Sequence, residues 1–168
     1  MPRVLRISNK LWSLRHRIEI FDDAGRLIYR CSRAALFSRS FVVIAEQTEV
    51  ARIRRKLLSW TPIWLVVGGA GDFAIRTRVF SLGRVYDVKG GPFHGAQVRG
   101  NLWDVKFMIA LGETLVARAN KRLISLRDTH AIEVVQDDDA SELFSVVAMI
   151  VILLHNKQKR DEDDEEWS

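Results

Sequence analysis

The stretch that decides the fold is Leu143-Phe144-Ser145-Val146-Val147-Ala148-Met149-Ile150-Val151-Ile152-Leu153-Leu154. Eleven of these twelve residues are apolar, so the stretch has no polar face in either a helix or a strand. A helix that is apolar all round must be buried on all sides. We therefore predict a hydrophobic helix over residues 140–156 that the rest of the chain encloses.

The residues on either side of this stretch favour a helix. Asp139 is the predicted N-cap, and Glu142 three residues later would complete a capping box. His155, Lys157 and Lys159 suit the negative end of the helix dipole. Two alternatives remain open, a membrane span, which needs about 20 apolar residues, and a β-strand built from the Val and Ile residues.

Short runs of β-forming residues, separated by turn residues, fill the chain before this helix. The clearest is Arg17-Ile18-Glu19-Ile20-Phe21, which alternates in polarity and is followed by the turn Asp22-Asp23-Ala24-Gly25. This pattern predicts about twelve strands, at residues 4–8, 17–21, 26–31, 39–45, 48–55, 62–68, 72–79, 84–89, 94–100, 104–110, 114–121 and 129–136.

An internal repeat underlies the strand pattern. A shift of 66 residues places Phe41 on Phe107 and Val50-Ala51-Arg52 on Val116-Ala117-Arg118, with seven identities in nineteen positions without a gap. Chance similarity between two strands of biased composition is the alternative. Because the same shift also aligns neighbouring strands, we predict two six-stranded halves.

The repeat also indicates which strand face is buried. Ala51 and Ile53 alternate with Arg52, Arg54 and Lys56, so small and apolar side chains share one face. Small inward residues leave room for a bulky element inside, and closing the sheet removes its edges. We predict a mainly β fold, a closed barrel of about twelve strands around a central hydrophobic C-terminal α-helix.

Composition indicates one folded domain, since 48% of the 168 residues are hydrophobic and 28% are charged. We predict that the domain covers residues 1–156 and that residues 157–168 form a disordered acidic tail. The tail carries three basic residues against six acids, a charge of −3, so the net charge of +5 leaves +8 on the domain. A single cysteine, Cys31, and an N-terminus without an apolar run predict a cytoplasmic protein, peripheral to a membrane if it binds one.

The sequence offers little support for catalysis. The four histidines, His16, His94, His130 and His155, are scattered, and no two have the spacing of metal ligands. The segment Gly68-Gly69-Ala70-Gly71 lacks the Lys-Ser/Thr of a phosphate loop and reads as a hairpin turn. We predict no enzymatic activity, no cofactor and no metal site.

Basic residues that alternate on strands are the candidate binding residues. They would bind the phosphate groups of lipids, and they are Arg52, Arg54, Lys56, Arg76, Arg78, Arg118 and Arg122. The plainer interpretation is a solvated outer face that also prevents aggregation. Exposed tryptophans such as Trp60, Trp64 and Trp103 would insert at an interface, although core positions are the commoner use of such residues.

These features together resemble the LURP-one-related family, which shares the tubby C-terminal-like fold with the phospholipid scramblases. The resemblance covers residues 3–155 and is carried by Leu11-Trp12-Ser13-Leu14 leading into residues 18–25, by residues 50–59 with their echo at 116–125, and by the terminal helix. It implies a twelve-stranded barrel around a central helix. In tubby proteins, basic residues on the outer barrel surface bind phosphoinositides, and the scramblase relatives are membrane-associated.

The sequence therefore predicts a non-enzymatic barrel that binds anionic phospholipid headgroups or a protein partner. A nucleic-acid-binding module is an alternative that a pI of 9.7 permits, although the basic strands lack interleaved aromatic residues. A scramblase-like membrane-associated protein is a third interpretation, which the short apolar run disfavours.

Overall fold

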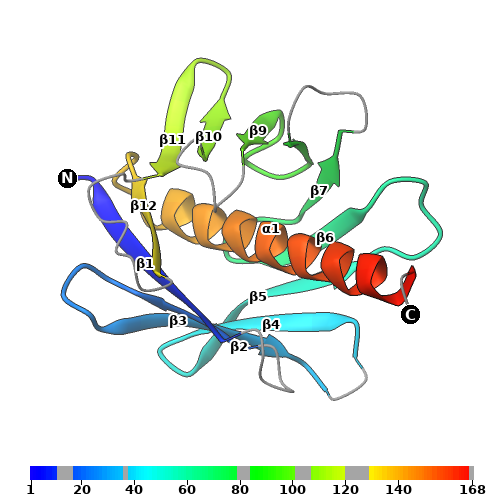
Figure 1. The fold of residues 1–168 in the computed structure, drawn as a ribbon. Coiled ribbons are helices and arrows are strands. Elements are labelled where there is room, and N and C mark those ends of the chain that lie inside the picture. The colour runs from blue at the N-terminus through cyan, green and yellow to red at the C-terminus, as the bar shows by residue number, and fades with distance from the viewer. Residues whose placement is uncertain (11–16, 36–37, 79–83, 101–106, 120–128, 167–168) are drawn as a thin grey trace.

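The computed structural model describes residues 1–10, 17–35, 38–78, 84–100, 107–119 and 129–166, and over these residues twelve antiparallel strands close into a barrel around one helix (Figure 1). The strands are β1 (Arg3–Lys10), β2 (Arg17–Phe21), β3 (Leu27–Arg33), β4 (Ser40–Ala45), β5 (Thr48–Arg55), β6 (Ile63–Gly68), β7 (Phe73–Thr77), β8 (Val85–Lys89), β9 (Ala96–Arg99), β10 (Met108–Leu111), β11 (Thr114–Ala119) and β12 (Thr129–Val134). The helix is α1 (Asp139–Glu166). The predicted fold class is confirmed.

Each strand pairs with its neighbours in sequence, and the pairing of the first strand with the last closes the ring. Strand β1 pairs antiparallel with β12, with Arg3 opposite Val134 and Ser8 opposite Thr129. Closure leaves no unpaired strand edge on which another chain could add a strand. The first and last strands are therefore held together by pairing between residues that lie far apart in the sequence.

The two halves predicted from the repeat are present in the backbone pairing. Val43 lies opposite Ala51 in the β4–β5 pair, and Ile109 lies opposite Ala117 in the β10–β11 pair, 66 residues further on. The pairing register shifts at the same place in both hairpins, directly after Val43 and directly after Ile109. A shared β-bulge is a local feature that chance similarity of two strands would not reproduce. The repeat is thus structural.

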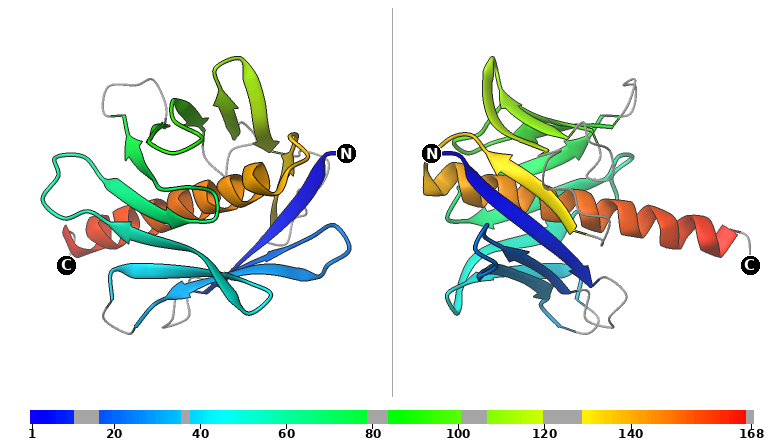
Figure 2. Two further views of the ribbon diagram at one scale, coloured as in Figure 1. Left: turned by 180° about the vertical axis from the view of Figure 1, so that it is seen from behind. Right: turned by 60° about the vertical axis from the view of Figure 1, so that its left-hand side comes forward.

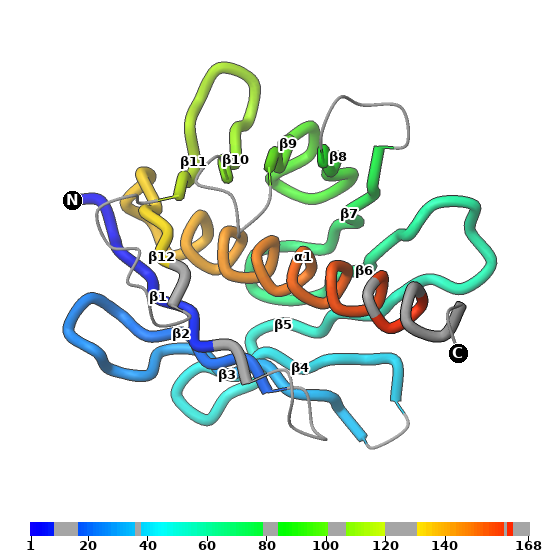
Figure 3. The backbone as a smooth tube through the Cα atoms, in the orientation of Figure 1, coloured from blue at the N-terminus to red at the C-terminus, as the bar shows by residue number. Residues whose placement is uncertain are grey.

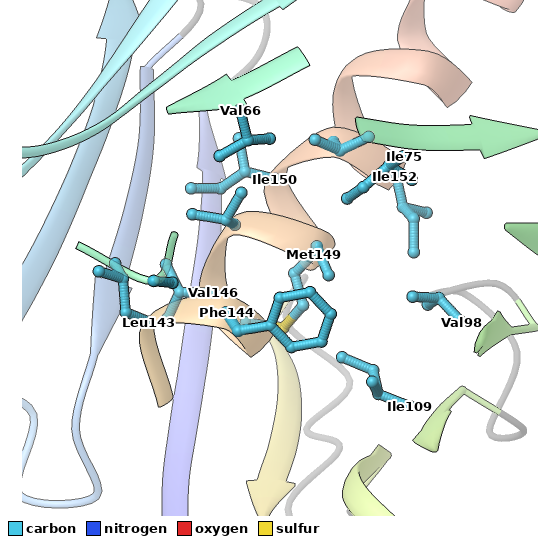
Figure 4. Packing of buried hydrophobic residues seen from close by; sticks show 14 of the residues in the cluster. Val66, Ile75, Val98, Ile109, Leu143, Phe144, Val146, Met149, Ile150 and Ile152 are labelled. Atoms are coloured by element: carbon cyan, nitrogen blue, oxygen red, sulfur yellow. The ribbon is translucent and has the colours of Figure 1, made fainter. Parts of the chain in front are cut away.

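The helix fills the barrel. Every residue from Leu143 to Leu154 is buried, as the apolar run predicted. Inward side chains of several strands reach the helix; Val66, Ile75, Val98 and Ile109 converge on its residues in Figure 4. Each fully buried Leu, Ile, Val, Phe or Met contributes about 1.5–3 kcal/mol, so the helix is a principal part of the core.

The start of α1 differs from the prediction by one residue. Asp138, not Asp139, is the N-cap, since its Oδ1 accepts a hydrogen bond from the Ser141 N–H at 2.8 Å. Glu142 does not complete a capping box. Its carboxylate accepts hydrogen bonds from Arg3 Nη1 at 2.8 Å and from Tyr29 Oη at 2.7 Å. Glu142 therefore ties the first turn of the helix to strands β1 and β3.

The end of α1 is a larger correction. The helix continues to Glu166, ten residues past the predicted end at Asn156, so the six consecutive acids lie within it. Lys157 and Asp161, one helical turn apart, form an ion pair at 4.0 Å, a spacing that supports an exposed helix. Figure 2 shows these last turns extending beyond the strands at one end of the barrel.

By length and composition α1 also qualifies as a membrane span. The segment Asp139–Lys159 has 21 residues and a mean hydropathy of 1.4 in its most apolar window. A helix at the centre of a globular fold passes the same test, and 78% of that window is buried within this structure. The barrel thus supplies the apolar surroundings that the helix requires.

Candidate anion-binding end of the barrel

The side chains of β5 point alternately into and out of the barrel, as predicted. Ala51 and Ile53 are buried against the core, whereas Arg52 and Arg54 are exposed. Lys56 follows the strand and is also exposed. The outer face of β5 is therefore basic.

The structure does not gather all predicted binding residues on one surface. Arg118 is exposed on β11, which lies six strands from β5 in either direction around the ring. Arg52 and Arg118 are thus on opposite sides of the barrel and do not share one surface. Arg122 lies outside the described residues. Arg76 is exposed on β7, and Arg78 is exposed directly after it.

Three of the candidate arginines are paired with carboxylates on their own side of the barrel. Arg52 bonds Glu49 at 2.9 Å, Arg118 bonds Glu133 at 2.8 Å, and Arg78 bonds Asp87 at 2.5 Å. Their carboxylate partners compensate much of the charge that a phosphate would meet. These three are therefore weaker candidates than their exposure alone indicates.

The remaining three candidates lie close to the connection between β5 and β6. Among the described residues, Arg54 and Lys56 have no ion-pair partner. Arg76 Nε donates a hydrogen bond to Thr61 Oγ1 at 3.2 Å, which places it beside the same connection. Because β5, β6 and β7 are neighbours, these cations border one region of the surface.

That connection, residues 56–62, is here named the apex loop. Leu58 and Trp60 are fully exposed, and Leu57 is 54% exposed. The loop is held in place by a hydrogen bond from the Lys56 N–H to the Ile63 carbonyl at 2.8 Å. Leu58 adopts a φ of 59°, a left-handed conformation that is unfavourable for a leucine. An anchored loop thus presents large apolar side chains to solvent at a cost in backbone strain.

In Figure 3, α1 leaves the barrel at the end where the apex loop lies. A groove of about 540 Å³ lies here, lined by Leu57 of the apex loop and by residues of α1. Four cations line it: Arg33, Arg39, Arg55 and Lys157. Sequence reasoning missed these residues, since they come from β3, the β3–β4 connection, the end of β5 and the helix. They meet only because the helix leaves the barrel at this point.

The groove is also lined by apolar and acidic side chains. Phe41, Leu57, Trp64 and Leu154 form the apolar wall, and the Arg33 guanidinium lies 5.8 Å from the centre of the Phe41 ring. Glu162 on the last turns of α1 is 3.6 Å from Arg55. The groove thus combines cations, an apolar wall and a weakly held internal carboxylate.

Burial shifts the pKa values of two titratable groups. His155 packs edge-on against Tyr86, and burial, aided by the cations Arg84, Arg55 and Lys159, lowers its pKa to about 4. Burial raises the pKa of the Cys31 thiol to about 12. No cluster of three or more His, Cys, Asp or Glu that could hold a metal occurs within the described ranges. What the arrangement can do is hold an anion against an apolar surface.

The comparisons with known proteins agree with the architecture. Among solved structures, the fold is similar to an X-ray structure of a protein from Arabidopsis thaliana, with a TM-score of 0.64 over 94% of this chain and 91% of that one at 17% sequence identity. That likeness shows the fold alone. No curated protein that was compared matches the sequence. The family description LURP-one-related matches residues 3–154, which include all twelve strands, and the chain therefore belongs to the LURP-one-related family.

Proposed function

We propose that this protein is a non-enzymatic, cytoplasmic binding protein that docks on anionic phospholipid membranes through the apex loop. The observation that supports the proposal is the full exposure of Leu58 and Trp60 on an anchored loop bordered by Arg54, Lys56 and Arg76. Large exposed apolar side chains with a basic surround are the combination that interfacial binding uses.

The energies fit reversible docking. Burying one leucine contributes up to about 1.5–3 kcal/mol, and each basic side chain near an anionic membrane contributes about 1 kcal/mol. Tryptophan suits the boundary because its ring is apolar while its N–H is polar. The sum corresponds to peripheral association, well below the affinity of a spanning helix.

Sedimentation with vesicles of phosphatidylcholine, with and without phosphatidylserine, tests the proposal. We expect binding that requires phosphatidylserine and weakens with added salt, because exposed charges are screened within about 8–10 Å at physiological ionic strength. The double change Arg54→Gln and Lys56→Gln should weaken binding about tenfold or more. Leu58→Ser with Trp60→Ser should weaken it at least as much, since the loop then has little to insert.

The repeat supplies a matched control. Arg52 and Arg118 are equivalent positions of the two halves, each exposed and each paired with a glutamate. Arg118→Gln, on the far side of the barrel, should leave vesicle binding unchanged. Equal losses from the far-side and the loop variants, or sedimentation with neither vesicle type, would contradict docking through the apex loop. Binding to protein or nucleic acid in place of vesicles would favour the alternatives.

A further inference from the structure

We infer that the groove beside the apex loop is a binding site for a single phosphomonoester carried on an amphiphile, and that the acidic last turns of α1 compete with that ligand. The inference rests on the proposed function, because docking on a membrane would bring the groove to a source of such ligands. A phosphomonoester can come from a lipid headgroup or from a soluble metabolite, and the experiment below separates the two.

The charge of the groove fits a dianion. Arg33, Arg39, Arg55 and Lys157 come from four parts of the chain and all line the same space. Arginine is well suited to phosphate because its planar group donates two parallel hydrogen bonds. Arg55 is 28% exposed, so its field is less screened than that of the outward-facing arginines of the same strand.

A buried donor on a residue that lines the groove lacks an acceptor. Trp64 is 2% exposed and lines the groove, and its indole Nε1–H has no hydrogen-bond partner among the described residues. Buried donors are almost always satisfied, because leaving one without a partner costs free energy. An oxygen of a bound ligand would supply the missing acceptor.

Two ion pairs within the groove are long. Glu162 Oε1 lies 3.6 Å from Arg55 Nη1, and Asp161 Oδ2 lies 4.0 Å from Lys157 Nζ. Both acids are more than half exposed, and exposed pairs of this kind contribute little. A ligand with two negative charges can therefore displace them.

The apolar wall selects an amphiphile over a free ion. Phe41, Leu57 and Leu154 border the groove, and Leu57 also belongs to the apex loop, so the apolar surface continues outward from the cations. The volume of about 540 Å³ lies in the range of small-molecule sites. A phosphate would sit among the cations while the attached chain follows the wall toward the loop.

Isothermal titration and amide–indole NMR of the full chain test the site without any bilayer. The probes are inorganic phosphate, glycerol 3-phosphate, dihexanoyl phosphatidic acid kept below its micelle concentration, and dihexanoyl phosphatidylcholine. We expect phosphatidic acid to bind best, phosphatidylcholine not to bind, and the Trp64 indole resonance, assigned with Trp64→Phe, to shift. Equal binding of glycerol 3-phosphate and phosphatidic acid would contradict the preference for an amphiphile. If none of the phosphate compounds binds, the groove is not a phosphate site.

Three variants report on the roles of the charges. Arg55→Gln should weaken phosphatidic acid binding about tenfold, whereas Arg52→Gln, on the outer face of the same strand, should not change it. Glu162→Gln should strengthen binding about two- to fivefold, since the competitor loses its charge. Unchanged affinity in Glu162→Gln would contradict competition between the acidic turns and the ligand. Unchanged affinity in Arg55→Gln would contradict phosphate binding in the groove.

The same reagents keep this inference separate from membrane docking. Leu58→Ser with Trp60→Ser should weaken vesicle binding about tenfold or more and leave the titration with soluble phosphatidic acid unchanged. Vesicle binding without soluble binding would support docking and overturn the groove site, and the reverse result would support the site and contradict docking.

Discussion

Two alanines occupy equivalent buried positions in the two halves of the barrel. Ala51 and Ala117, equivalent positions of the two halves, are both buried in the core around α1. Ala51→Trp or Ala117→Trp should overpack this core and lower the free energy of unfolding by about 1–3 kcal/mol or more. Arg52→Trp, one residue away but exposed, should change it by no more than about 0.5 kcal/mol. Thermal unfolding of the three variants provides the check, and equal losses would mean that the faces are reversed.

His155 makes stability depend on pH in a defined window. Its pKa falls from 6.5 to about 4 on folding, mainly through burial, so between these values the unfolded chain binds more protons than the folded one. Stability should therefore rise with pH from about 4 to 6.5 and level off above. Asp22, Asp137 and Asp138 have pKa values lowered from 3.8, so they titrate below this window.

A comparison with His155→Phe isolates this contribution. Between pH 5 and pH 7 the wild type should gain about 1 kcal/mol more stability than the variant, after discounting for the water that reaches the ring. Urea unfolding at the two pH values measures it. The same pH dependence in both proteins would show that the histidine charges freely in the folded state.

Among the elements, α1 contributes a large part of the buried apolar core. Truncation after Asp139 removes ten buried Leu, Ile, Val, Phe and Met side chains, each contributing about 1.5–3 kcal/mol. Their sum exceeds the roughly 5–15 kcal/mol net stability of a typical domain. The product should be insoluble or should lack a cooperative unfolding transition in circular dichroism. Truncation after Arg160, which removes only the acidic turns, is the control and should leave a folded barrel. A folded, soluble barrel without α1 would refute this account.

Local sequence patterns were enough to predict most of the strands and the centre of the helix. Strand positions followed from alternation, since a barrel wall has one apolar face and one polar face at every strand. The centre of α1 followed from a run that is apolar all round. The end of α1 did not, because a block of acids reads as a solvated tail, whereas attachment to a long buried helix allows the turns to continue. Asp138 was passed over as N-cap for Asp139, one of three consecutive aspartates with the same local signal.

For the whole molecule, sequence patterns identified charged faces but not which faces meet. The repeat places Arg52 and Arg118 at equivalent positions, and ring closure then separates them by half the barrel. The groove is the opposite case, since Arg33, Arg55 and Lys157 share no local pattern and meet only at the exit of the helix. Sites assembled from distant segments follow from topology, which alternation and spacing do not encode.

The same topology predicts a single orientation on a membrane. The β4–β5 turn lies near Glu142 at the start of α1, and because strands alternate in direction, the β10–β11 turn lies at that end too, away from the apex loop. A nitroxide label on Ser59→Cys should gain oxygen accessibility when anionic vesicles are added, while one on Glu113→Cys should not. The native Cys31 thiol, buried and with its pKa raised to about 12, should not take up the label. Equal responses at both labels would indicate binding without a fixed orientation.

The helix α1 follows all twelve strands in the sequence and fills the barrel that they form. The order of synthesis therefore limits when the fold can be completed. The ribosome delivers β1 long before β12, its partner across the seam, and delivers α1 after both. Until then the inward residues of the strands have no helix to cover them, and contacts this distant in sequence form slowly. The nascent chain therefore emerges as hairpins with exposed apolar faces, which can become one cooperative unit only after α1 has been synthesised.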